Sequence, residues 1–255
     1  MCNWEKGVVM YKEYFECDKN EYVQIIKDSI VDYFEKINLD FDFKVKRIYN
    51  TTYEFAPIFC PLTLNTHLDT DVIYLNTKGY EYWNQVIYQL SHELTHCFIY
   101  CHNNSDDYKS SWIEETICEA ISLYFLNYFY KNWEETELYK YNVIYKKYLK
   151  EYLDNILNQI GTRELSNSKN YDELMKIESS SQKKREQRKE EMKELYFKVT
   201  EKEIKGIINY RDYIIKDKKI LDTGKYIKDF PDNNAVLFLC SLQNSILNKE
   251  LVYDR

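Results

Sequence analysis

The stretch LSHELTHCFI occupies residues 90–99 and lies within a longer segment, Tyr80 to Cys101, whose apolar spacing predicts a helix. His92 and His96 are four residues apart, so on a helix their imidazoles lie on the same face, one above the other. Two imidazoles in this arrangement can bind one metal ion, and Glu93 beside them can act as general base toward a water on that ion. The motif therefore predicts a metal site, and it contains two of the chain's 4 histidines.

The next predicted helix, Ser111 to Tyr130, contains the stretch WIEETICEA at residues 112–120. Together the two stretches resemble the gluzincin metallopeptidases, the thermolysin-like clan. In that clan a glutamate on the helix after His-Glu-x-x-His is the third metal ligand, and an acidic residue four positions later orients the first histidine. Glu115, which lies 19 positions after His96, and Glu119 match this pair. The stretch is also similar to the Trp-x-x-Glu-Gly-x-Ala motif of several small gluzincin families, with Thr116 and Cys118 in place of Gly and Ala.

This resemblance implies a zinc metallopeptidase with a defined site. His92, His96 and Glu115 would bind Zn²⁺, Glu119 would orient His92, and Glu93 would activate the water. Helical geometry agrees independently, because Glu115 and Glu119 share a face, and a metal-bound histidine usually gives its other N–H to a carboxylate. Glu114 as the third ligand, and a ligand elsewhere, stay open as alternatives, although Glu114 fits better as a first-turn glutamate favoured by the helix dipole.

The resemblance covers residues 71 to 130 and so includes a predicted strand, Asp71 to Asn76. In gluzincins an edge strand before the active-site helix borders the cleft and pairs with the extended substrate. An unpaired strand edge suits that role, since main-chain hydrogen bonds accept any peptide. Ile73, Tyr74 and Leu75 are therefore expected to bind a peptide or protein substrate.

We predict an α+β fold with a small N-terminal mixed sheet, whose edge strand packs on the His-Glu-x-x-His helix, and a mainly helical C-terminal subdomain. Only 5 glycines and 3 prolines occur in 255 residues, which favours long helices over many tight turns. Residues 1–130 would form the catalytic region and 131–255 the helical subdomain, with a hinge at 161–182. The predicted strands are about eight residues around Phe41–Val45, Tyr53–Phe59 and Asp71–Asn76, and the remaining predicted helices are Glu21–Asn38, Glu134–Ile160, Gln182–Lys198 and Asn233–Asn248.

Composition narrows the cellular context. The net charge of −7 disfavours binding to nucleic acid. Because the sequence has no run of 18 consecutive apolar residues, we expect no membrane span. The N-terminus has no apolar signal region, and the 7 cysteines are odd in number and irregularly spaced, which indicates a reducing compartment. We expect a cytoplasmic protein, with a mature lipoprotein start at Cys2 as the minor alternative.

Three other functions stay open. The zincin core could be a scaffold whose helical C-terminal half binds a partner, or the chain could be an intracellular regulatory peptidase of the kind that cleaves a phage repressor. A peptide deformylase also carries His-Glu-x-x-His with an upstream cysteine ligand, for which Cys60 is the candidate. In a peptidase the missing oxyanion donor would be Tyr210, Arg211 or Tyr213, because no histidine follows His102.

Overall fold

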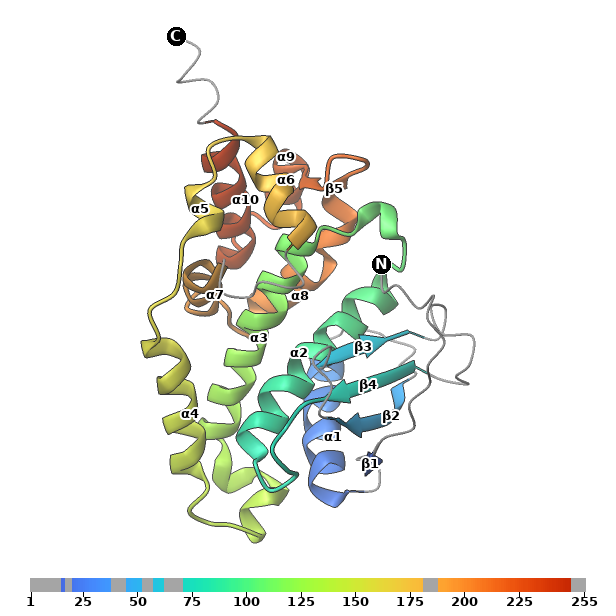
Figure 1. Ribbon diagram of the computed structural model, residues 1–255, viewed down its shortest axis with the longest axis vertical. Helices are drawn as coiled ribbons and strands as arrows, with labels where there is room; N and C mark the ends of the chain where they lie inside the picture. The colour runs from blue at the N-terminus through green and yellow to red at the C-terminus, as the bar shows by residue number, and fades with distance from the viewer. Residues whose placement is uncertain are drawn as a thin grey trace.

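The computed structural model describes residues 15–16, 20–37, 45–51, 57–61, 71–180 and 188–248. The fold is α+β, with a small mixed sheet beside helices α1 and α2 and a group of helices at the other end of the molecule (Figure 1). One buried apolar cluster contains residues from both the N-terminal region and the predicted helical subdomain, from Val23 to Ile246. The two predicted regions therefore share a hydrophobic core.

Helices α2 (Trp83–His102) and α3 (Ser111–Lys131) form the centre of the molecule and pack against each other (Figure 1). Helix α3 is buried around most of its circumference, as expected for a helix that is apolar on all sides. The other α-helices are α1 (Glu21–Lys36), α4 (Lys146–Asn158), α5 (Glu164–Asn167), α6 (Tyr171–Ser180), α7 (Lys189–Tyr196), α8 (Glu201–Ile208), α9 (Thr223–Asp229) and α10 (Asn234–Leu247). Both predicted site helices are thus confirmed.

The sheet corrects the prediction of an edge strand. Its order is β1 (Phe15–Glu16), β2 (Val45–Asn50), β4 (Asp71–Leu75) and β3 (Ile58–Cys60). Strand β4 pairs in parallel with β2 and antiparallel with β3, so it has a neighbour on each side. Val72, Ile73 and Leu75 are fully buried. The expectation that Ile73, Tyr74 and Leu75 offer an open edge to a substrate is wrong, because the short strand β3 occupies that edge as far as Tyr74.

The strand predictions around residues 41–44 and 53–56 fall outside the described residues. Within the described part, a strand is present near each predicted position: β2 begins at Val45 and β3 at Ile58. A separate hairpin that was not predicted joins β5 (Ile214–Ile215) to β6 (Ile220–Leu221). Asp217 and Lys219 in its turn have positive φ angles, so a turn without glycine was missed.

The structure corrects one prediction for the C-terminal half. Residues 134–160 form short 3₁₀ turns (Trp133–Glu135 and Glu137–Lys140) followed by α4 rather than one helix. The expected hinge contains α5 and α6, whose apolar residues Leu165, Leu174 and Ile177 are buried. Their apolar residues are few but spaced for packing, and Glu178 of α6 accepts a hydrogen bond from the Trp112 backbone N–H (2.9 Å).

None of the helices in the described ranges is long and apolar enough to cross a membrane.

Candidate metal centre

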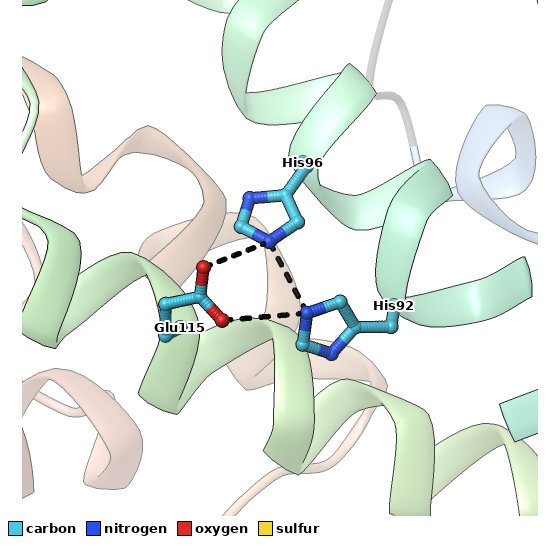
Figure 2. Close-up of side chains that lie close together, drawn as sticks. All are labelled: His92, His96 and Glu115. Carbon is cyan, nitrogen blue, oxygen red and sulfur yellow. Dashed lines mark hydrogen bonds and ion pairs between the residues drawn. The ribbon is translucent and has the colours of Figure 1, made fainter. Parts of the chain in front are cut away.

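Three side chains from α2 and α3 converge at the centre of the molecule. His92 Nε2 and His96 Nε2 are 3.2 Å apart, and the two oxygens of Glu115 lie 3.5 Å from His92 Nε2 and 3.6 Å from His96 Nε2 (Figure 2). The helical spacing of the histidines brings their rings together, and α3 crosses α2 so that Glu115 points at both rings. This buried group could hold a metal ion.

The contacts of His96 determine which of its nitrogens faces the cluster as an acceptor. Its Nδ1 lies 2.9 Å from Glu114 Oε1, and a carboxylate accepts hydrogen bonds, so Nδ1 carries the proton. In the neutral ring the lone pair is then on Nε2, which faces His92 and Glu115. A carboxylate on the other nitrogen is the usual companion of a metal-bound histidine.

A cation between two unprotonated imidazole nitrogens and a carboxylate would be attracted by all three groups. A tetrahedral zinc with ligands at 2.0–2.1 Å places its ligand atoms about 3.3 to 3.4 Å apart. The two nitrogens are 3.2 Å apart, and each lies 3.5 or 3.6 Å from one of the two Glu115 oxygens, which is close to this spacing. The donor set and its dimensions therefore fit a small divalent cation without rearrangement of the two helices.

Glu119 lies on the far side of His92. Its Oε1 is 3.8 Å from His92 Nδ1, and its Oε2 accepts a hydrogen bond from the Tyr88 hydroxyl. The His92 Nδ1 atom is buried without a hydrogen-bond partner, so a small rotation of the ring or the carboxylate would join the two groups. The predicted role of Glu119 in orienting His92 stays a prediction, with the two side chains facing each other at slightly more than hydrogen-bond distance.

Glu115 is held as a carboxylate by its surroundings. Burial alone would raise its pKa, but His96, His92 and Arg188 outweigh burial and keep the pKa of Glu115 well below its usual range. Arg188 Nη2 donates to Glu115 Oε2 at 3.3 Å, and the whole Arg188 side chain is buried. The proposed third ligand is therefore ionised and ready to bind a cation.

Glu114 has a different set of partners from the one expected. It is buried, and it accepts hydrogen bonds from Arg211 Nε (3.0 Å) and Nη2 (2.8 Å) and from the Tyr210 hydroxyl, in addition to its contact with His96. Burial would raise the pKa of Glu114, but Arg211 and His96 hold it well below its ordinary value. Glu114 lies in the first turn of α3, as expected, and it is in addition a buried anion that contacts His96.

The same contacts correct the candidates for an oxyanion donor. Tyr210 and Arg211 both bind Glu114, and Tyr213 donates to Asp229 at 3.0 Å. These side chains are therefore committed to structural partners. His102 bonds Asp212 (2.7 Å) at the C-terminal end of α2, away from the group that could hold a metal.

Glu93 is buried between the two histidines on α2, with 2% of its surface exposed. Burial raises the pKa of the Cys118 thiol, and the carboxylates of Glu114, Glu115, Glu93 and Glu119 raise it further. The negative charge of Glu93 on α2 thus acts on Cys118 of the neighbouring helix α3. Cys60, the candidate deformylase ligand, is not part of that cluster.

Three contributors to the site were missed in the sequence. For Glu114, the helix-dipole interpretation accounts for its place in the first turn of α3 but does not predict its contact with His96. Arg188 lies in the predicted helix Gln182–Lys198, and neither Arg188 nor Tyr88 belongs to the predicted site. Tyr88 precedes His92 by four residues and therefore shares its helix face, which is a signal that could have found it. Arg188 gives no local signal, since it meets Glu115 only through the tertiary fold.

Comparisons with known proteins find no matching family model, no matching curated protein and no matching solved structure. The functional argument therefore rests on the residues and the geometry of this chain.

Proposed function

We propose that the protein is a zinc-dependent metallopeptidase. One observation carries the proposal: His92, His96 and Glu115 bring three acceptor atoms together in a buried place at the spacing of a tetrahedral metal site. The sequence order His-Glu-x-x-His followed by a glutamate on the next helix supports the peptidase assignment, because it supplies a general base next to the metal ligands.

Zinc is the cation that this donor set favours. Two imidazole nitrogens and one carboxylate suit Zn²⁺, whereas Mg²⁺ and Ca²⁺ prefer oxygen ligands alone. Three protein ligands leave one coordination position for water or substrate, as in catalytic zinc sites. A structural zinc would instead be expected to have four protein ligands.

When bound, the zinc ion would lower the pKa of a water molecule and polarise the substrate carbonyl. Glu93 accepts the proton of the attacking water as the new carbon–oxygen bond forms. The same carboxyl group then gives the proton to the amide nitrogen as the carbon–nitrogen bond breaks, so that the products are a carboxylate and an amine. Glu114 holds His96 in the tautomer that presents Nε2, and Glu119 is placed to do the same for His92.

The decisive experiment measures metal content and peptide hydrolysis in the wild type and in the variant Glu93→Gln. Glu151→Gln, the same change on an exposed face of α4, is the matched control. We expect one zinc per chain in all three proteins and a loss of hydrolysis of at least about 100-fold in Glu93→Gln only, since general-base catalysis contributes roughly 10²- to 10⁴-fold.

Two results would contradict the proposal. Purified protein that takes up no stoichiometric zinc would show that the three acceptor atoms do not form a metal site. Protein that binds zinc but cleaves no member of a broad peptide library would instead favour the scaffold function, in which the metal stabilises a partner-binding protein.

A further inference from the structure

A cavity of about 410 Å³ lies next to the proposed metal centre. It is formed where α4 and α7 approach α2 and α3, and its wall includes Tyr88, Glu119, Tyr152, Ile156, Arg188 and Met192. We propose that this cavity binds the C-terminal residue of a peptide substrate, with a large apolar side chain against its apolar wall and the terminal carboxylate at its basic side. This inference rests on the proposed function and names its substrate class.

Two side chains of the cavity wall also contact residues of the proposed metal centre. Arg188 lines the cavity and donates to Glu115 at 3.3 Å. Glu119 lines it as well, and its carboxylate lies 3.8 Å from His92. A ligand in the cavity is therefore separated from two of the three proposed metal ligands by one side chain each.

The apolar wall determines which side chain the cavity would take. Tyr88 and Tyr152 meet edge to face, with ring centroids 6.0 Å apart, and Ile156 and Met192 complete the wall. Aromatic rings prefer such edge contacts, and methionine adapts to the shape of its neighbour. A cavity of this size, among the smaller ligand sites, has room for one large residue rather than for a folded segment.

The charged side chains of the wall determine the polar part of the ligand. They comprise two basic residues, Arg188 and Lys189, and one acidic residue, Glu119. Lys189 Nζ donates to the Gln159 amide oxygen at 2.6 Å, and this contact holds the amine at the cavity wall. The cavity wall therefore has more basic than acidic side chains, whereas the whole chain has a net charge of −7. A carboxylate is the peptide group that a basic wall recognises best.

The test is direct binding, which does not depend on hydrolysis. The probes are N-acetyl-L-phenylalanine, its amide and N-acetylglycine, titrated by calorimetry or NMR into the full chain with and without zinc. We expect the phenylalanine acid to bind about 10-fold more tightly than its amide, the value of one charge-assisted hydrogen bond, and N-acetylglycine to bind more weakly than both.

Paired variants locate the binding site. Ile156→Trp fills the cavity and is expected to abolish binding, whereas Ile144→Trp, the same change at a residue that is 64% exposed, is expected to leave it unchanged. Lys189→Met is expected to weaken binding of the acid to the level of the amide, with Lys147→Met on the exposed face of α4 as the control. If Ile156→Trp does not fold, Lys189→Met decides the result.

The possible failures are distinguishable. Equal binding of acid and amide, or binding that neither variant changes, would overturn the cavity proposal, as would cleavage of internal peptide bonds with no preference for an apolar C-terminal residue. In that last case the peptidase function would stand. Selective binding of the acid without hydrolysis of any peptide would support the cavity proposal and contradict the peptidase function.

Discussion

Glu114 and Glu115 are neighbours on α3, and both are buried, yet they belong to opposite kinds of charge cluster. Glu114 receives hydrogen bonds from Arg211 and Tyr210 and orients His96, so its negative charge is matched by donors within the protein. Glu115 faces the two Nε2 atoms of His92 and His96, and the contact of His96 Nδ1 with Glu114 leaves the lone pair of the neutral His96 ring on Nε2. The first cluster is complete without a ligand, and the second favours a cation.

The difference shows how one turn of helix serves two purposes. The Glu114 cluster ties α3 to the chain around Arg211, which also donates to the Asn103 carbonyl at the end of α2 (2.6 Å). It therefore connects both site helices outside the group that could hold a metal. Because these contacts do not involve a metal, His92, His96 and Glu115 would be held together before an ion binds, as a precise site requires.

The largest expected effect, on the free energy of unfolding, comes from removing Arg211 from the Glu114 cluster. Arg211→Met leaves the buried carboxylate of Glu114 without its main cation, and removing one partner of a buried ion pair costs about 3 to 5 kcal/mol in the free energy of unfolding. Urea denaturation of the metal-free protein measures this loss. The double variant Glu114→Gln/Arg211→Met should be more stable than Arg211→Met alone, because it removes the unpaired charge. Additive losses would show that the two residues do not act as a pair.

The next largest effect tests whether His92, His96 and Glu115 bind zinc. Zinc at 100 times its dissociation constant should raise the free energy of unfolding of the wild type by about 2.7 kcal/mol. Glu115→Ala and His96→Ala should abolish this increase, since each removes one of three ligands. Thermal unfolding with and without zinc, and with EDTA as the reversal, measures it. A zinc-dependent increase that survives in both variants would place the ion elsewhere.

The two clusters also show what could be predicted from the sequence. His92, Glu93 and His96 were predictable because a helix converts their spacing into a shared face. Glu115 followed from the same rule and from the resemblance of its surroundings to the gluzincins. The first-turn position of Glu114 was predictable, but its pairing with Arg211 was not, since Arg211 is 97 residues away in the sequence and meets α3 only in the folded chain.

The region from α4 to α7 was the least predictable, for the same physical reason. Charged side chains are usually exposed, but Arg188 and Glu191 are buried. Glu191 accepts a hydrogen bond from the Ser166 backbone N–H (2.7 Å), and Arg188 meets Glu115. Charge in a sequence indicates solvent exposure only when no distant partner is available. The edge-strand error has a similar origin, because β3 pairs with β4 over few residues and gives a weak pattern.

A smaller effect is expected on the other side of His92. Glu119→Ala should reduce zinc affinity by about 10- to 100-fold, as the loss of a carboxylate that orients a metal-bound histidine usually does. Ser122→Ala, a buried position on the same helix whose hydroxyl bonds the Cys118 carbonyl, is the matched control and should leave affinity unchanged. Competition with a chelator of known affinity measures both. Equal affinities for wild type and Glu119→Ala would show that the separation of 3.8 Å persists when zinc binds.

The smallest effect concerns Tyr88, whose hydroxyl donates to Glu119. Tyr88→Phe removes one hydrogen bond, which costs about 0.5 to 1.5 kcal/mol in the free energy of unfolding, and it should weaken zinc binding by less than Glu119→Ala does. If Tyr88 acts on the metal only through Glu119, the change should have no further effect on zinc affinity in the Glu119→Ala background, so that the two losses are not additive. Additive losses in this double-mutant cycle would instead mean that Tyr88 supports His92 by a separate route, through the helix face that the two residues share.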